Sequence, residues 1–380
     1  MDLTFSDEQR LLRESVDRFI TGTYDADHRR RSAGDPLGFS RSIWKQFAEL
    51  GWLALPIEED FGGLGAGAIE TGILMEAFGR GLVTEPYLST VVIGAGLISE
   101  CAGEAQKRAI LPAVADGSLT LAFAHSERAA RFDLAQVETT ATKTPDGWRL
   151  DGRKTAVLDG HAADRIIASA RIGDGAAGKI CLFLVPSGAN GLISRDFARL
   201  GGGRACNLDL SDVRLPADAL LGDGADSLVK IEAVVDRALA ALGSEAVGIM
   251  QTLLDRTLEY TKVRQQFGRP LCANQVIRHR LADMAMQCDE ARSIALRAAL
   301  MAGDDPRSRG RAASGAKAKI GKCARFVAEQ AVQLHGAMGV TEELDIGAYF
   351  KRLLAFDTMF GGSAHHYRRH AALGGWTIQT

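Results

Sequence analysis

This 380-residue chain lacks the features on which several classes of protein depend. It has no run of basic residues and a formal net charge of only -2, so nucleic-acid binding is not indicated. It also has no signal peptide and no apolar stretch of about 20 residues, the length that crosses a bilayer. We therefore expect a soluble, cytoplasmic protein that binds neither nucleic acid nor membrane.

Cysteines are few and widely scattered. None of the six forms the Cys-x-x-Cys pair that is typical of a zinc site or a redox motif. We interpret them as reduced residues that mostly serve packing. They lie at Cys101, Cys181, Cys206, Cys272, Cys288 and Cys323.

Two nucleotide and nucleophile motifs are also missing. The glycine-rich segment Pro56–Gly67 lacks the Gly-Lys-Ser/Thr of a P-loop and has no evident strand–loop–helix context, so it reads as a connector. No Gly-x-Ser-x-Gly elbow is present, which argues against a hydrolase.

Three histidines near the C-terminus could suggest a metal site. His366 and His370 are four residues apart and His365 adjoins them, but no Glu follows His366 as in the zinc-protease pattern. A solvated helix face is the favoured interpretation, and no metal is predicted.

The spacing of apolar residues divides the chain into three parts. Residues 1–117 show helical spacing in three segments, the first preceded by Ser6 as a candidate N-cap. Residues 118–221 read as short strands separated by Asp/Gly turns, and residues 222–380 return to helical spacing. The predicted helices include 7–20, 40–50, 69–78 and 273–301, and the predicted strands are 148–152, 165–170, 179–185 and 207–210.

Two segments of the third part suit a pyrophosphate and an adenosine. In Arg264-Gln-Gln-Phe-Gly268, Arg264 offers a planar fork of donors and Phe267 an apolar face. About 65 residues later, Gln333-Leu-His-Gly-Ala-Met-Gly-Val340 offers Gly336 and Gly339, which permit close approach of the backbone. Each segment alone has a plainer interpretation, such as a helix-end cation followed by a glycine C-cap.

Taken together, in this order and spacing, the two segments resemble the acyl-CoA dehydrogenase family, over essentially the whole chain. The resemblance implies an α+β fold with an N-terminal helical domain, a middle β-barrel-like domain and a C-terminal four-helix bundle. It further implies FAD as cofactor, an acyl-CoA thioester as substrate and an electron-transferring flavoprotein as acceptor. Arg264, Phe267, Gln333 and Gly336 would bind the ADP part of FAD, and His335 would pack beside them or lie next to the pyrophosphate.

The catalytic base of this family is missing from its usual place. Members use a Glu in a Tyr-Glu-Gly-Thr segment, but the corresponding Met359–Ser363 puts Phe360 or Gly361 there. A minority carry the Glu near the start of a long helix, where this chain has Ala238. Asp236 and Glu245 lie near that position and are the candidates for a displaced base, although acids near a helix start are more often caps.

Residues that would contact the flavin ring have also changed. The family's Thr-Glu-Pro-Gly-Ala-Gly-Ser-Asp stretch corresponds to Ser126-Glu-Arg-Ala-Ala-Arg-Phe-Asp133, which retains Ser126 as a cofactor contact but loses the glycines. Arg131 and Phe132 would crowd a site that needs open backbone. The family's Trp-Ile-Thr element becomes Ala156-Val-Leu158.

A chain that keeps the ADP-side residues and loses the ring-side ones resembles the small subunit of bacterial heteromeric acyl-CoA dehydrogenases, such as the pimeloyl-CoA dehydrogenase small subunit. In such a complex it would complete the FAD site of a larger subunit. Two alternatives stay open. One is a homomeric dehydrogenase, dimeric or tetrameric, with Glu245 or Asp236 as base. The other is an assembly protein without flavin or catalysis.

Overall fold

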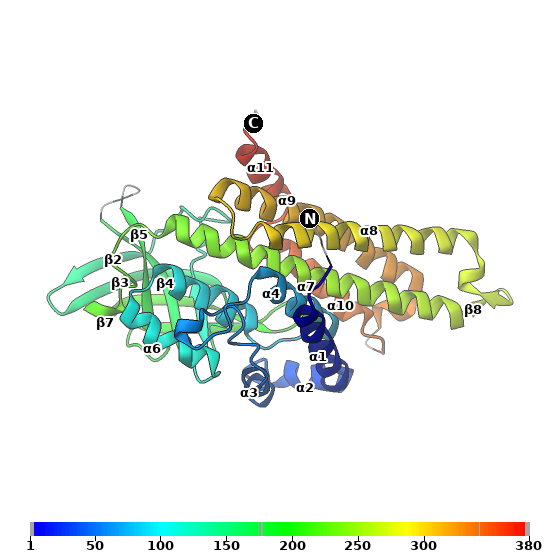
Figure 1. Cartoon of the computed structure of the whole chain (residues 1–380), viewed down its shortest axis with the longest axis horizontal. Coiled ribbons are helices and arrows are strands. Elements are labelled where there is room, and N and C mark those ends of the chain that lie inside the picture. Colours follow the sequence, from blue (N-terminus) through cyan, green and yellow to red (C-terminus); the bar gives the residue numbers. More distant parts are fainter. Residues whose placement is uncertain (1–3, 174, 176–177, 342, 377–380) are drawn as a thin grey trace.

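The computed structural model describes residues 4–173, 175, 178–341 and 343–376. Helices of the C-terminal part run along the length of the molecule (Figure 1). The β-sheet lies at one end of these helices, and the short β8–β9 hairpin lies at the opposite end. The N-terminal helices pack against one side of this long body.

The N-terminal part is helical, as predicted. Ser6 caps the first helix, because its hydroxyl accepts from Gln9 N at 3.2 Å and the Gln9 side chain accepts from Ser6 N at 3.0 Å. The π-helix η2 is an irregularity that apolar spacing did not predict. The elements are α1 (Asp7–Thr23), α2 (Ala26–Gly34), α3 (Arg41–Glu49), η1 (Glu59–Phe61), α4 (Ala68–Gly81), η2 (Leu88–Ala95), α5 (Gly96–Cys101) and α6 (Glu104–Ala115).

The middle part is a curled, mostly antiparallel sheet in the order β1-β4-β2-β3-β7-β6, with β5 paired to β4. The pairing of β3 with β7 has two register shifts, the second between Lys154 and Val157. Ala156 lies at this shift with a φ of 52°. The bounds are β1 (Leu121–Ala124), β2 (Thr140–Thr144), β3 (Gly147–Leu158), β4 (Arg165–Ile172), β5 (Lys179–Pro186), β6 (Leu192–Ala198), β7 (Arg204–Pro216) and η4 (Ala217–Ala219).

The C-terminal part is built around three long helices that pack on one another. The helix predicted over 273–301 has an apolar residue every three or four positions, a pattern that predicts one buried stripe. Leu281, Met284, Cys288, Ala291 and Ala295 of this stripe are buried, whereas Ile277 is half-buried. The elements are α7 (Leu228–Val263), β8 (Gln265–Gln266), β9 (Arg269–Pro270), η5 (Leu271–Ala273), α8 (Gln275–Leu300), α9 (Pro306–His335), η6 (Gly336–Val340), α10 (Ile346–Thr358) and α11 (Ser363–Leu373). The α+β class and the order of helices, sheet and helices are thus confirmed.

Two glycines bring the N-terminal part and α7 into backbone contact. A Cβ on Gly79 of α4 would lie 2.0 Å from the Glu245 carbonyl oxygen, and one on Gly248 of α7 would lie 1.9 Å from the Glu76 carbonyl oxygen. No side chain fits at either position, so α4 and α7 cross at van der Waals distance. This crossing fixes the middle of α7 against α4. None of the described helices is long and apolar enough to span a membrane.

Candidate functional site

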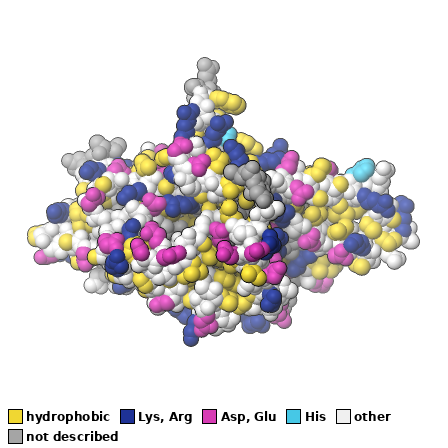
Figure 2. Space-filling model, viewed as in Figure 1, with side chains coloured by type: hydrophobic (Ala, Val, Ile, Leu, Met, Phe, Trp, Pro, Cys, Tyr) yellow, Lys and Arg dark blue, Asp and Glu magenta, His cyan; other side chains and the backbone are white. Residues whose placement is uncertain are grey.

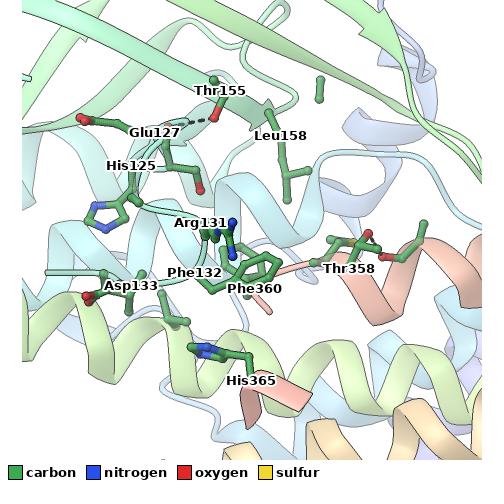
Figure 3. Close-up of a pocket in the computed structure, with 18 of the residues that line it drawn as sticks. His125, Glu127, Arg131, Phe132, Asp133, Thr155, Leu158, Thr358, Phe360 and His365 are labelled. Carbon is green, nitrogen blue, oxygen red and sulfur yellow. Dashed lines mark hydrogen bonds between the residues drawn. The ribbon is translucent and has the colours of Figure 1, made fainter. Parts of the chain in front are cut away.

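A pocket of about 860 Å³ opens where the sheet meets the C-terminal helices (Figure 3). Its walls come from the loop after β1, the ends of β3 and β6, the first turns of α7, and α10 and α11. It lies where the sequence placed the flavin ring and base, because Ser126, Leu158 and Phe360 all line it. The pocket is also lined by His125, Glu127, Arg128, Arg131, Phe132, Asp133, Thr155, Arg199, Glu232, Val235, Leu239, Leu354, Met359, His365 and Arg369.

The loop after β1 is anchored by a buried ion pair. Lys154 Nζ lies 2.6 Å from Glu127 Oε1 and 2.9 Å from Ser169 Oγ. Glu127 also accepts from Thr139 Oγ1 and from the backbone N–H of Glu138, both at 2.6 Å. Burial would raise the pKa of Glu127, but Lys154 and these donors hold it below its usual value. The carboxylate is fully occupied in this network and is not free to act as a base.

The rest of this loop carries Arg131 and Phe132, which were predicted to crowd the flavin ring. Arg131 has a positive φ of 51°, unusual for a residue with a Cβ. Phe132 follows it, and its ring centroid lies 5.6 Å from that of His365 on α11. The backbone oxygen of Ser126 accepts from Thr155 N at 2.8 Å, which joins the loop to β3. Both Arg131 and Phe132 line the pocket.

His125, just before this loop, is the unusual polar group of the pocket. It is buried and stacks on Phe123 with ring centroids 5.2 Å apart. Neither ring nitrogen has a partner at hydrogen-bond geometry in the described part of the chain. Burial, reinforced by the charge of Lys154, lowers the pKa of His125 to about 3 and outweighs the opposing effect of the Leu134 backbone, so the imidazole is neutral at physiological pH.

The segment after α10, where the sequence predicted the usual position of the base, is held by its backbone. Lys317 Nζ donates to the carbonyl oxygen of Gly361 at 2.7 Å and to that of Asp357 at 3.3 Å. His366 Nε2 lies 3.0 Å from the Phe360 carbonyl oxygen. This turn therefore presents an apolar ring and a glycine, the two residues that the sequence predicted at the place of the base.

The predicted solvated face is wrong for one of the three histidines on α11. His366 is buried, because it packs between the Phe360 carbonyl and Ser314, whose Oγ lies 3.3 Å from Nδ1. His370 Nδ1 lies 2.9 Å from the Arg311 carbonyl oxygen. Across the described residues, no group of three or more His, Cys, Asp or Glu side chains could hold a metal ion.

The two displaced-base candidates are both ion-paired and do not line the pocket. Asp236 is buried against Arg369, whose Nη2 lies 3.2 Å from Oδ2, and Arg309 Nε lies 3.6 Å from the same oxygen. Glu245 Oε1 accepts from Arg352 Nε at 2.7 Å and lies 2.6 Å from Arg352 Nη2. A base role for either residue stays a prediction, but its carboxylate would first have to leave an arginine.

Sequence reasoning missed a pocket carboxylate that no cation holds. Glu232, on the first turns of α7, lines the pocket and has no hydrogen bond or ion pair to any described residue. Burial raises the pKa of Glu232 above its usual value; the charge of Arg369 opposes this effect, and that of the neighbouring Asp236 adds to it. The sequence does not single out Glu232, because it does not show which carboxylate Arg369 pairs with. In the structure Arg369 pairs with Asp236.

Sequence reasoning also missed a pocket cation. Arg199, just after β6, donates through Nη2 to the sulfur of Met359 at 3.2 Å, and no described carboxylate lies within ion-pair distance of it. Burial and the nearby Arg352 lower the pKa of Arg199 to about 10, which leaves it charged at physiological pH. Asp159 acts on it only from a longer distance.

The four ADP-side residues lie away from this pocket. Arg264 ends α7, and Phe267 in the adjoining hairpin is 98% exposed with a φ of 53°. Gln333 and Gly336, at the end of α9, are also exposed. Figure 2 shows Lys and Arg side chains gathered at the end of the molecule that carries the β8–β9 hairpin of Figure 1.

His335, between those residues, is a packing residue in this structure. Its ring is buried and stacks on Tyr260 with centroids 4.3 Å apart. Its Nδ1 lies 2.8 Å from the Ala331 carbonyl oxygen. The stack on Tyr260 joins the end of α9 to the end of α7, and so fixes the two segments predicted to bind the ADP part of FAD relative to each other.

Comparisons with known proteins agree along the whole chain. Residues 6–118, 122–213 and 231–372 match the family models for the N-terminal, middle and C-terminal domains of acyl-CoA dehydrogenase. "Probable acyl-CoA dehydrogenase YngJ" of Bacillus subtilis is 31% identical, and the alignment covers 91% of this chain and 92% of that protein.

Two solved structures are similar over nearly their full length. A variant of the "Tcur3481-Tcur3483 steroid ACAD" has a TM-score of 0.87 and 30% identity, covering 97% of this chain and 98% of that one. "Crystal structure of the ChsE4-ChsE5 complex from Mycobacterium tuberculosis" has a TM-score of 0.89 and 25% identity, covering all of both chains.

Proposed function

Because the chain belongs to the acyl-CoA dehydrogenase family, we propose that it is the small subunit of a heteromeric, FAD-dependent acyl-CoA dehydrogenase. The family catalyses α,β-dehydrogenation of acyl-CoA thioesters, in which the flavin takes the hydride. In this proposal the chain supplies Arg264, Phe267, Gln333 and Gly336 to the ADP part of FAD bound on a larger subunit. Its own pocket carries no flavin ring.

The observation that carries the proposal is the separation of the two half-sites on one helix. Val235 lines the pocket, and Arg264 lies 29 positions further along at the end of α7. At 1.5 Å per residue they are about 44 Å apart. The ring-side and ADP-side residues of one chain therefore serve different sites, and the ADP-side set needs a partner.

The pocket's own chemistry supports a non-catalytic role. Phe360 and Gly361 stand at the place of the base, and Glu127, the nearest retained acid of the ring segment, is bound to Lys154. Arg131 and Phe132 occupy the loop that would meet the ring. A pocket without an open ring face cannot perform the family's reaction on its own, because the hydride has no flavin to accept it.

Two of the similar structures carry the names of pairs of proteins, and one of these pairs is described as a steroid ACAD. They support a heteromeric assembly for this chain. The proposed substrate remains an acyl-CoA thioester of unspecified acyl group. The proposed electron acceptor remains an electron-transferring flavoprotein.

Co-expression with a dehydrogenase-like subunit encoded nearby tests the proposal. The Arg264→Ala variant should co-purify with its partner but carry little FAD, because the pyrophosphate loses its bidentate donor. Arg269→Ala is the matched control, since Arg269 is an exposed arginine of the same hairpin whose side chain bonds Asn274. Unchanged flavin content in Arg264→Ala would overturn the assignment. No flavin even in the wild-type complex would indicate the assembly protein instead.

Glu232 supports a second candidate, a homomeric dehydrogenase with a displaced base. It is a pocket carboxylate with a raised pKa and no bound cation, which is the usual state of a general base. This function requires that the lone chain bind flavin and reduce a dye with an acyl-CoA. Glu232→Gln should then abolish turnover while flavin stays bound, and full activity in that variant would exclude Glu232.

A further inference from the structure

The two segments predicted to bind the ADP part of FAD, residues 264–268 and 333–340, come from two different helices. The first begins where α7 ends, and the second covers the end of α9 and the turn η6. Each segment carries only some of the predicted contacts, Arg264 and Phe267 on one, Gln333 and Gly336 on the other. One ligand reaches both sets only if the two helix ends keep a fixed spacing.

Tyr260 connects the two helix ends. It lies one turn before Arg264 on α7, and its backbone oxygen accepts from Arg264 N at 2.9 Å. Its ring stacks on that of His335, the last residue of α9, with centroids 4.3 Å apart and 27° between the planes. Its hydroxyl donates to the His335 carbonyl oxygen at 3.4 Å. The last carbonyl groups of a helix lack a partner within that helix, so a hydroxyl from α7 suits this position.

The His335 ring is held in place from within α9. It is buried, and its Nδ1 lies 2.8 Å from the Ala331 carbonyl oxygen. Because a carbonyl oxygen only accepts, Nδ1 carries the proton and donates. Burial lowers the pKa of His335, against the opposing effect of the Ala331 backbone, so the ring is neutral at physiological pH. Tyr260 therefore packs on a fixed, uncharged face.

The turn after α9 also packs on His335. A Cβ on Gly339 would lie 2.8 Å from the Val332 carbonyl oxygen and 3.1 Å from the His335 Cβ, so η6 folds back closely on the end of α9. Gly336 differs, since an added Cβ would have nothing within 4 Å and its φ is 61°. The close approach at Gly339 is thus made by the chain itself, whereas the space beside Gly336 is open.

We propose that Tyr260 is a positioning residue for the ADP part of FAD, and that it acts through its stack on His335. This inference rests on the proposed function, because it concerns the site that the two segments would form for a flavin on the larger subunit. The stack holds the helix ends at one spacing, and the exposed side chains of Arg264 and Gln333 make the contacts. Without the stack FAD would have to order the two ends itself, at a cost in affinity.

The test measures FAD binding to the deflavinated complex of this chain with its larger subunit, by the change in flavin fluorescence. Tyr260→Leu should raise the FAD dissociation constant about tenfold, the scale of one lost aromatic pair, while the complex still assembles. Tyr260→Phe keeps the ring and should bind FAD as the wild type does. An unchanged dissociation constant in Tyr260→Leu, or an equal loss in Tyr260→Phe, would overturn the positioning role of the ring.

His335 offers a second variant of the same contact, which also serves if Tyr260→Leu does not assemble. His335→Leu should weaken FAD binding as much as Tyr260→Leu does. The double variant should be little weaker than either single one, because both changes remove one stack. Fully additive losses would show that the two residues act separately, and would refute the proposal.

A second tyrosine–histidine pair provides the matched control. Tyr24 packs on His28 with ring centroids 4.7 Å apart, and α2, which carries His28, lies away from β8 in Figure 1. Tyr24→Leu should lower the melting temperature and leave the FAD dissociation constant unchanged. Equal weakening of FAD binding by Tyr24→Leu and Tyr260→Leu would mean a general loss of stability, and would contradict a positioning role.

The two proposals fail in different ways. If Arg264→Ala strips flavin from the complex but Tyr260→Leu and His335→Leu do not weaken FAD binding, only the positioning role is contradicted. If the complex holds FAD equally well in Arg264→Ala, the proposed function itself is contradicted.

Discussion

Arg352→Met should destabilise the chain strongly, because it leaves the Glu245 carboxylate buried without a counter-ion. Arg352 on α10 pairs with Glu245 on α7 and lies 3.4 Å from the carbonyl oxygens of both Val83 and Gly202. Val83 follows α4 in the N-terminal part, Gly202 lies between β6 and β7 in the middle part, and Glu245 and Arg352 lie on helices of the C-terminal part. The contacts of Arg352 therefore join all three parts of the molecule.

The magnitude follows from the burial of the pair. The Glu245 and Arg352 side chains are 8% and 13% exposed, and breaking such a pair by removing one partner costs about 3–5 kcal/mol. At roughly 2–4 °C per kcal/mol for a domain of this size class, the melting temperature should fall by about 6–20 °C. Replacing both residues by apolar ones of similar size should recover most of this loss.

The assay is thermal unfolding of the co-purified complex at one protein concentration, for Arg352→Met, Glu245→Leu and the double variant. A wild-type melting temperature in Arg352→Met, or a double variant less stable than either single one, would refute this reasoning. Glu245→Gln adds a catalytic test, because its amide oxygen still accepts from Arg352. Retained flavin with abolished turnover in that variant would make Glu245 a base, against our account.

Three further predictions concern a helix crossing, a buried histidine and the place of the base. Gly248→Ala should destabilise the chain by about 1–3 kcal/mol in urea unfolding, since its Cβ would overlap the Glu76 carbonyl. Gly22→Ala, at a position on α1 with open space around it, should not destabilise the chain. Equal effects of the two variants would contradict the helix crossing. Burial holds the pKa of His125 at about 3, below its unfolded value of about 6.5. The neutral ring's contribution to the free energy of unfolding is therefore complete above about pH 6.5 and is lost as the pH falls toward 3. The loss is at most about 1.4 kcal/mol per pH unit. Urea unfolding of His125→Leu should show a shallower loss between about pH 7 and 5.5, and an unchanged slope would refute this. Phe360→Glu should restore no turnover to the lone chain in a dye-reduction assay, because the ring-facing loop still carries Arg131 and Phe132; turnover in that single variant would contradict the loss of the ring site.

Much of the fold could be predicted because the helix signals are local. Ser6 and Gln9 form a capping box within one turn, and the stripe on α8 recurs every three or four residues. The strands that were missed have weaker signals. β1 has only the four residues Leu121–Ala124, and β6 has exposed residues along nearly its whole length, so neither shows the alternation that marks a half-buried strand.

The site could be predicted only where it depends on residue identity. The absence of a carboxylate from Met359–Ser363 is visible from the sequence, as is the lack of glycine around Arg131. The states of His125, Glu232 and Arg199 are not, because each depends on which neighbours the fold brings within reach. Glu245 shows the same limit, since its identity as an acid suggested a base while its contact with Arg352 gives it a structural partner.

The most direct test of the central claim is the visible absorption spectrum of the chain purified alone and of the chain co-expressed with a larger dehydrogenase subunit. Our account predicts no flavin bands in the lone chain, and bands in the complex that an acyl-CoA bleaches. Flavin bound by the lone chain and reduced by an acyl-CoA would contradict it, and would make this protein a self-contained enzyme.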